Sequence, residues 1–376
     1  MSKLTRYKLS DLYEMSSGIS STKEQAGHGY PFVSFSTVFN NFFLPEELPD
    51  LMDTSSEEQE TFSVKKDDVF ITRTSETVDA LAMSCVAVKD YPKATFSGFV
   101  KRLRPKKKGI VYSRYIAFFL RSKYFRKVLD CNTIMTLRAS FNEDIFSFLY
   151  LYLPNYEEQV RIGDFLYKIE MKIRKNNKIN DNLEQQIKTI FTFQFLQNAN
   201  TEWKQQSLAE LSKMYQPKTI SGKDLIADGN YFVYGANGII GKYNQYNHSE
   251  SEIAVACRGA SCGSIQMTLP FSWITGNAMV VRPHSDFPYR EYLYYYLLAK
   301  NPNYLCSGSA QPQLTRENLT LYSLKVPSTT ELNAFENYAE KVRKIIIKNQ
   351  LENIELSTLR DWLLPMLMNG QATISD

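Results

Sequence analysis

The sequence has few of the residues from which metal and redox sites are built. Its 376 residues include only 5 cysteines and 3 histidines. The cysteines are irregularly spaced and form no CxxC pair, which is typical of a reduced intracellular protein. No histidine gathers beside them, so a zinc site is not expected. We therefore predict reduced cysteines and no bound metal.

Long apolar runs are also missing. No stretch approaches the roughly 18 apolar residues needed to cross a bilayer, and the N-terminal MSKLTRYKLSD lacks the apolar centre of a signal peptide. We expect a cytoplasmic protein with no membrane partner. The formal net charge is only +4, so a polyanionic partner would have to be met by local patches. The length suits two globular domains plus helices.

One long segment occurs twice, with an offset of 173 residues that carries Pro154 to Pro327. Both copies keep apolar residues at alternating steps of four and three, which is typical of a coiled-coil seam. Each seam contains two asparagines, which favour one register because a misaligned asparagine is buried without a partner. The predicted helix-pairing residues are Ile162, Leu166, Ile169, Ile173, Asn176, Asn180 and Leu183, with Phe335, Val342, Ile346, Asn349, Asn353 and Leu356.

We predict that these two helices pair with each other. The alternative is that each is an ordinary amphipathic helix packed on its own core. The direction stays open on the heptads alone, because Asn180 meets Asn349 in antiparallel order and Asn353 in parallel order. Both helices are expected to begin shortly after a proline, with acidic residues in the first turns. The second is expected to end near Asn369 and Gly370.

The segments before the two helices share an order of features. Each has a polar entry, an apolar strand ending at an arginine (Arg73, Arg258), a glycine, a run closing on Arg-Pro, an aromatic helix and a final short strand. The predicted fold class is α+β, with two similar α+β domains separated by two long repeated helices. The expected parts are domain 1 at residues 1–153, helix 1 at 154–198, domain 2 at 199–326 and helix 2 at 327–376.

Two segments resemble catalytic motifs and fail on spacing. Residues 235–243, GANGIIGKY, have five residues between the glycines where a phosphate loop has four, and Tyr243 stands where Ser or Thr would hold magnesium. We expect a glycine-rich turn between strands. Residues 301–304, NPNY, lack the second proline of the adenine methyltransferase motif, and we expect a helix-terminating turn. The chain is predicted to have no catalytic residue and no cofactor of its own.

Six cations fill eight positions at residues 101–108, where domain 1 passes from strand to helix. Phosphate oxygens are their natural partner, so the run is predicted to be a sequence-independent DNA anchor. The alternative is a solvated basic loop. The residues of this candidate anchor are Lys101, Arg102, Arg104, Lys106, Lys107 and Lys108.

Base reading requires side chains that donate and accept in fixed pairs, such as Arg with guanine and Gln with adenine. The polar loops before each helix and the strand ends supply such groups at like places in both domains. Each residue alone is more typical of a capped turn. The candidate base contacts are Arg73, Thr74, Thr136, Arg138, Arg258, Ser309, Gln311, Gln313 and Arg316, and Lys242 is a further predicted DNA-binding residue.

The whole pattern resembles the specificity subunits of type I restriction-modification systems. The resemblance is carried by the repeated helix with its LPNYEEQ entry and by the YGANGIIGKYN, ACRGASCG and SGSAQPQLTREN segments. It implies two domains that each read one half of a bipartite duplex DNA site, held apart by an antiparallel helix pair. It also implies two modification subunits that bring S-adenosylmethionine, and restriction subunits that can join with ATP and magnesium.

Methylation and cleavage then belong to the partner subunits, and the chain itself is not an enzyme. A rival interpretation is a non-enzymatic coiled-coil scaffold that joins proteins. A third is a solitary adenine methyltransferase using residues 301–304. Sequence-specific binding of double-stranded DNA is the interpretation that the duplicated domain and helix favour.

Overall fold

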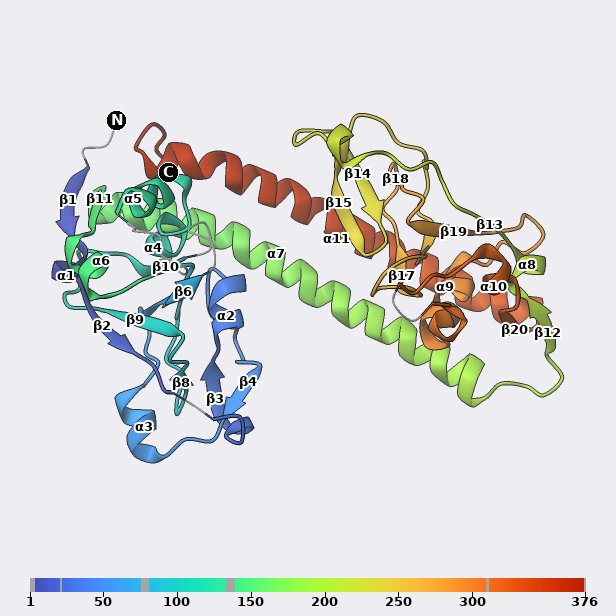
Figure 1. Cartoon of the computed structure of the whole chain (residues 1–376), viewed down its shortest axis with the longest axis horizontal. Coiled ribbons are helices and arrows are strands. Elements are labelled where there is room, and N and C mark those ends of the chain that lie inside the picture. The colour runs from blue at the N-terminus through green and yellow to red at the C-terminus, as the bar shows by residue number, and fades with distance from the viewer. Residues whose placement is uncertain (1–3, 21, 76–80, 133–138, 309–310, 375–376) are drawn as a thin grey trace. The chain divides into compact units, whose positions relative to one another are not determined.

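The computed structural model describes residues 4–20, 22–75, 81–132, 139–308 and 311–374. It divides into unit 1, formed by Met1–Lys175 and Glu352–Asp376, and unit 2, formed by Asn176–Leu351. Two long helices, α7 (Tyr156–Phe191) and α11 (Thr329–Met368), each contribute to both units (Figure 1). The π-helix η2 (Thr192–Gln197) continues α7.

Unit 1 is built on a four-stranded antiparallel sheet with the order β2-β9-β5-β7. These strands are β2 (Tyr13–Ser17), β9 (Val100–Pro105), β5 (Val69–Thr72) and β7 (Ser84–Val86). A second sheet has the order β4-β3-β8, with β4 (Asp50–Met52), β3 (Ala26–Val33) and β8 (Thr95–Phe96). Two short ribbons pair β1 (Thr5–Lys8) with β11 (Tyr150–Leu153) and β6 (Thr74–Ser75) with β10 (Ala139–Ser140).

The helix α4 and the two long helices cover one face of the main sheet of unit 1, and α2 packs against the other. The aromatic helix α4 (Ser113–Phe119) buries its rings in one cluster with β5, with Ile162 and Leu166 of α7 and with Leu364 of α11. All four residues of β5 are buried, as expected for a strand covered on both faces. The other helices are α1 (Leu9–Leu12), α2 (Phe35–Asn40), α3 (Ser56–Thr61), α5 (Lys123–Asn132) and α6 (Glu143–Phe148).

Unit 2 repeats this plan. Its four-stranded sheet has the order β13-β19-β16-β17, with β13 (Ser212–Tyr215), β19 (Ala278–Pro283), β16 (Ile253–Ala256) and β17 (Ile265–Met267). A smaller sheet has the order β15-β14-β18, with β15 (Gly238–Tyr243), β14 (Tyr231–Gly235) and β18 (Trp273–Ile274). A ribbon pairs β12 (Lys204–Ser207) with β20 (Ser323–Val326).

The core of unit 2 gathers the aromatic helix α9 (Arg290–Ala299) and parts of both long helices. Phe191 of α7, Tyr292 of α9 and Phe335 of α11 lie in one buried cluster, and the ring centroids of Phe191 and Phe335 are 5.6 Å apart. The other helical segments are α8 (Leu208–Leu211), η3 (Gly222–Asp224), η4 (Pro302–Leu305) and α10 (Arg316–Thr320).

Strand register shows that the two units are built alike. Val69 pairs with Leu103 in unit 1, and Ile253 pairs with Val281 at the same place in unit 2. One residue before each inner strand, a buried carboxylate meets the arginine of the Arg-Pro pair: Asp68 with Arg104, and Glu252 with Arg282. The prediction of two similar α+β domains with two long repeated helices is confirmed. The predicted domain boundaries stay predictions.

The two look-alike motifs are turns, as predicted. Residues 235–243 form the hairpin of β14 and β15, where Gly238 has a φ of 90° that favours glycine. After α9, Asn301 caps the short η4, its side chain accepting from the backbone N–H of Asn303. Helix α11 ends at Met368, close to the predicted stop, and Gly370 has a φ of 72°.

The prediction that all cysteines are reduced is wrong for one pair, because Cys262 and Cys306 form a disulfide. Their sequence separation of 44 residues gave no spacing signal, since the fold brings two distant loops together. Cys85 and Cys257 are free and buried. Within the described ranges, no helix has the length and apolarity of a membrane span, and no cluster of three or more His, Cys, Asp or Glu could hold a metal ion.

Candidate nucleic-acid interface

In unit 1, two of the predicted base-contacting residues directly follow the C-terminal end of the inner strand β5. The backbone N–H of Arg73 donates to the carbonyl of Phe99 over 2.9 Å, and the carbonyl of Arg73 accepts from Phe141 over 2.8 Å. The next residue, Thr74, pairs with Ser140. Arg73 is exposed and Thr74 is half-buried. The backbone thus joins the end of β5 to the loop that precedes α6.

Thr136 and Arg138, the other predicted base contacts of unit 1, lie outside the described residues. In unit 2, Ser309 also lies outside them.

In unit 2, the structure brings the strand end and the polar loop together. Arg258 forms an antiparallel bridge with Gln313, which also pairs with Ser307, and the N–H of Gly259 donates to the carbonyl of Pro312 over 3.0 Å. The Cys262–Cys306 disulfide links the same two loops. Arg258, Gln311, Gln313 and Arg316 are exposed. The strand end and the loop together therefore expose two side-chain amides and two guanidinium groups to solvent.

The strand arginines of the two units differ in register by one residue. Phe141 donates to Arg73, whereas the equivalent Leu314 donates to Cys257 over 2.9 Å. Arg73 thus corresponds to Cys257, and Arg258 corresponds to Thr74. The prediction that both strands end at an equivalent arginine was wrong, because the backbone hydrogen bonds, and not residue identity, define which positions are equivalent. Neighbouring strand residues point to opposite faces, so the side chains of Arg73 and Arg258 are expected to leave the backbone on opposite faces.

The first half of the basic run at residues 101–108 is engaged within unit 1. Lys101 and Arg102 are buried on β9, and their side chains donate to Ser17 and to the carbonyl of Ser63. Arg104 forms an ion pair with the fully buried Asp68 over 2.6 Å, and this hydrogen bond raises the pKa of Arg104. These three cations stabilise the fold through contacts inside the unit.

The second half of the run lies at the opposite end of β9 from Arg73. The strand has 6 residues, so about 20 Å separates its ends. Lys106, Lys107 and Lys108 are exposed, and Lys106 donates to the carbonyl of Ser10 over 2.7 Å. The structure therefore separates the candidate phosphate anchor from the candidate base contacts.

Lys107 and Lys108 line a cavity of about 360 Å³ beside Tyr156, the first residue of α7. Lys66, Arg114 and Asp67 also line the cavity, so its basic side chains outnumber its acidic one.

The remaining predicted contact, Lys242, lies on β15 with its Nζ 5.6 Å from the centre of the Phe232 ring. The tip of this hairpin touches the main sheet, because the side chain of Gln266 donates to the carbonyl of Gly235 over 3.0 Å. The structure does not bring Lys242 into contact with the Arg258 loop.

Within unit 2, the predicted helix seam is formed in antiparallel order. Asn349 of α11 donates to the side chain of Asn180 of α7 over 2.8 Å, and Asn180 donates to the carbonyl of Ile346. Ile187 of α7 lies in one buried cluster with the predicted seam residues Phe335, Val342 and Ile346 of α11. The same cluster contains Ala339, which lies between them at the heptad spacing. Leu183 packs against that cluster.

Within unit 1, Ile162 and Leu166 lie in one cluster with Leu364 and Leu367 of α11. Two ion pairs join the same helix segments, Glu170 with Arg360 over 2.9 Å and Lys172 with Glu352 over 3.2 Å. Of the other predicted seam residues in this unit, Ile169 is buried and Ile173, Asn353 and Leu356 are half-buried; Asn176, the first residue of unit 2, is buried. The predicted pairing of the two helices is therefore confirmed in both units.

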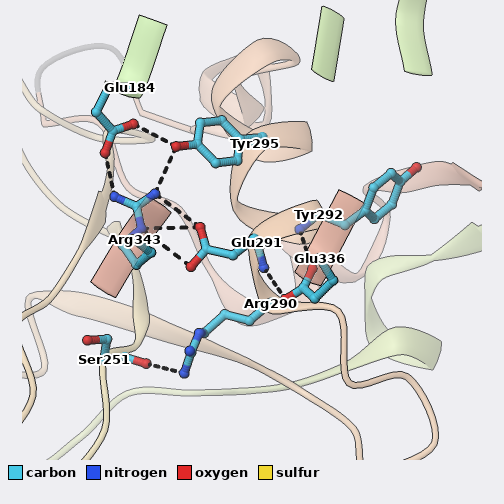
Figure 2. Close-up of polar contacts among 8 residues, drawn as sticks. All are labelled: Glu184, Ser251, Arg290, Glu291, Tyr292, Tyr295, Glu336 and Arg343. Carbon is cyan, nitrogen blue, oxygen red and sulfur yellow. Dashed lines mark hydrogen bonds and ion pairs between the residues drawn. The ribbon is translucent and has the colours of Figure 1, made fainter. Parts of the chain in front are cut away.

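A buried charge cluster accompanies the seam in unit 2, and sequence reasoning missed it (Figure 2). Arg343 of α11 forms ion pairs with Glu184 of α7 and Glu291 of α9, and it also donates to the hydroxyl of Tyr295 over 3.0 Å. The carboxylates of Glu291 and Glu184 raise the pKa of Arg343 although burial alone would lower it. Burial raises the pKa of Glu291 in spite of Arg343.

Glu336 of α11 caps the start of α9 in the same region. Its carboxylate accepts hydrogen bonds from the backbone N–H groups of Glu291 (2.8 Å) and Tyr292 (3.1 Å), two of the donors that a helix N-terminus leaves unpaired (Figure 2). Burial raises the pKa of Glu336 to about 7. In the sequence, Glu184, Glu336 and Arg343 each directly follow an apolar seam position, whereas Glu291 lies on α9 and has no such signal.

A family model matches most of the chain, and a curated protein matches about a third of it. The family model described as the type I restriction modification DNA specificity domain matches residues 1–185 and 200–358. The Type I restriction enzyme EcoprrI specificity subunit of Escherichia coli is 30% identical over 131 residues, which is 34% of this chain and 32% of that protein. The match thus spans about a third of this curated relative.

The fold has a solved counterpart. The crystal structure of a type I restriction-modification system S subunit from M. genitalium matches with a TM-score of 0.66 at 14% identity, covering 97% of this chain and 96% of that one. At this identity the match concerns the fold alone. The family model covers well over half of the sequence, with one copy in each half. The chain therefore belongs to the family of type I restriction-modification specificity subunits.

Proposed function

We propose that each unit reads one half of a bipartite site in double-stranded DNA, and that the chain supplies this sequence specificity to a methyltransferase complex. The observation that carries the proposal is a feature found at the end of β5 in unit 1 and at the end of β16 in unit 2. In each unit the same backbone pairing joins the end of an inner strand to a polar loop, and exposed arginines or amides stand there. Such groups form the paired donors and acceptors that distinguish base edges in the major groove.

The paired helices α7 and α11 serve as the spacer between the two reading units and as the docking site for two modification subunits. Methylation, with its S-adenosylmethionine, belongs to those partners. Restriction subunits that join them bring ATP hydrolysis, magnesium and cleavage. The chain itself holds no cofactor and has no catalytic residue. The complex acts on DNA in the cytoplasm.

The test is to map methylated adenines in DNA treated with the assembled complex. Gln311→Ala and Arg316→Ala remove exposed groups from the loop of unit 2. They should relax base preference in one half of the recognised site and leave the other half and the spacing unchanged. Gln205→Ala, at an exposed position on β12, is a matched control that should change neither half.

Salt dependence gives a second readout. DNA binding through phosphate contacts weakens steeply as salt rises, because each contact releases counterions. Binding that ignores salt and DNA sequence would instead favour the protein-joining scaffold. A relaxed preference in both halves from a change in unit 2 alone would contradict the division of labour between the units.

A further inference from the structure

An exposed phenylalanine, Phe99, lies beside the candidate base contact Arg73 in unit 1. Phe99 lies in the turn between β8 and β9 and is 66% exposed. Its carbonyl accepts the hydrogen bond from Arg73, a candidate base contact. A single exposed apolar side chain is ordinary on a protein surface. What distinguishes Phe99 is its place beside Arg73 and the way its turn is held.

Three hydrogen bonds fix the backbone of this turn. The N–H of Gly98 donates to the carbonyl of Ile19 over 2.7 Å, the N–H of Phe99 to the hydroxyl of Ser97 over 3.2 Å, and the N–H of Val100 to the carbonyl of Ser97 over 2.9 Å. A Cβ at Gly98 would come within 2.9 Å of the Ile19 carbonyl, so glycine is required there. The backbone thus holds the ring in solvent, and little ordering is needed on binding.

The equivalent turn of unit 2 carries a different side chain in the same backbone position. Cys257 donates to the carbonyl of Asn277 over 2.9 Å, as Arg73 does to Phe99, and Gly276 precedes Asn277 as Gly98 precedes Phe99. Asn277 is exposed as well. A position whose backbone is kept while its exposed side chain changes from apolar to amide is expected where two domains read different bases.

We propose that Phe99 contacts the C5 methyl group of a thymine in the half-site read by unit 1. The inference rests on the proposed function. The thymine methyl is the one apolar group that base pairs present in the major groove, and an aromatic side chain is a suitable partner for it. Neighbouring strands lie about 4.8 Å apart and base pairs about 3.4 Å apart, so Arg73 and Phe99 address the same or adjacent base pairs.

The test uses the assembled complex containing the full chain, and duplexes in which each thymine of the mapped site is replaced in turn by uracil. Loss of one contacted methyl group should weaken wild-type binding about fourfold at a single position. Phe99→Ala should bind the thymine duplex about fourfold more weakly and lose its sensitivity to uracil there. Phe99→Leu, which keeps an apolar contact, should retain that sensitivity. Phe148→Ala is the matched control, since Phe148 is 70% exposed but ends α6, next to β11.

The inference is overturned if Phe99→Ala keeps the uracil sensitivity at every position. It is equally overturned if wild-type binding ignores all thymine methyl groups, the result expected from a ring stacked between bases. These outcomes leave the proposed function intact as long as Gln311→Ala still alters one half-site. If wild-type complex shows no base preference in either half, the proposed function itself fails.

Discussion

The side-chain amide of Asn349 donates a hydrogen bond to the side-chain oxygen of Asn180 over 2.8 Å. The heptad pattern allowed Asn180 to meet either Asn349 or Asn353, and the observed pair is the antiparallel one. Asn180 is 7% exposed, and it also donates to the carbonyl of Ile346. A shift of register within this antiparallel order would separate the two asparagines and leave the buried amide of Asn180 without this partner, so the pair fixes how α7 and α11 align in unit 2.

Asn349→Leu should lower the unfolding free energy of the protein by about 1–3 kcal/mol, because it leaves a buried oxygen of Asn180 unpaired. The double variant Asn180→Leu with Asn349→Leu should recover most of that loss, since both polar groups are then gone. Denaturant unfolding followed by circular dichroism measures both. Asn182→Leu, at an exposed position on α7, should change little. A double variant no more stable than the single one would show that the pair does not act as a unit.

Arg343→Met should destabilise the protein by about 3–5 kcal/mol, because it leaves the fully buried carboxylate of Glu291 without its ion pair and also removes the ion pair with the half-buried Glu184. Glu352→Gln removes an exposed ion pair with Lys172 and should cost less than about 1 kcal/mol. The two variants are compared in the same denaturant series. If the two variants lose the same unfolding free energy, the burial of the Arg343 ion pairs does not determine how much they stabilise the protein.

Stability should depend on pH through Glu336. Its pKa rises from 4.5 to about 7 on folding because of burial, so the folded protein binds more protons than the unfolded chain between these values. By linkage, this contribution is present below about pH 4.5 and is lost as the pH rises toward 7. Glu336→Gln should remove up to about 3 kcal/mol of that pH dependence.

Melting temperatures from pH 5 to pH 8 measure this effect. Glu291, whose pKa is also raised by burial, remains in the variant, so a smaller slope of the same sign should persist. The same change of stability between pH 5 and pH 7 in the wild type and in Glu336→Gln would contradict this assignment.

Much of the fold could be predicted because helices and strands repeat on regular periods. Seam residues such as Leu166, Ile346 and Asn180 follow from heptad spacing, and the duplication follows from a constant offset of 173 residues. The direction of pairing could not be predicted from the heptads, because both orders place asparagines at the seam. It required the contact between Asn180 and Asn349.

The candidate site was less accessible to sequence reasoning because it depends on pairing between distant strands. The basic run looks uniform in sequence, yet Arg104 faces the buried Asp68 while Lys107 is exposed. Arg73 and Arg258 look equivalent as letters, yet their hydrogen-bond partners place them one residue apart. Phe99 carries no motif, and only its exposure beside Arg73 marks it.

The split of the basic run gives another prediction. Replacing Lys107 and Lys108 together by alanine should weaken DNA binding by the assembled complex to a similar degree for every sequence, and it should reduce the slope of affinity against salt. Arg104→Ala should instead lower the stability of unit 1, because it leaves Asp68 buried and unpaired. Binding titrations at several salt concentrations, with melting curves, separate the two effects. A change in base preference from the lysine variant would argue against a phosphate role.

The most direct measurement of the central claim is a base-resolved footprint of the assembled complex on its mapped DNA site. Two reading units joined by a helical spacer should give two protected segments with base preference in each, separated by base pairs whose identity does not matter. Gln311→Ala should relax base preference in one segment and Phe99→Ala should alter the other. A single continuous footprint, or protection that ignores the sequence, would contradict the account.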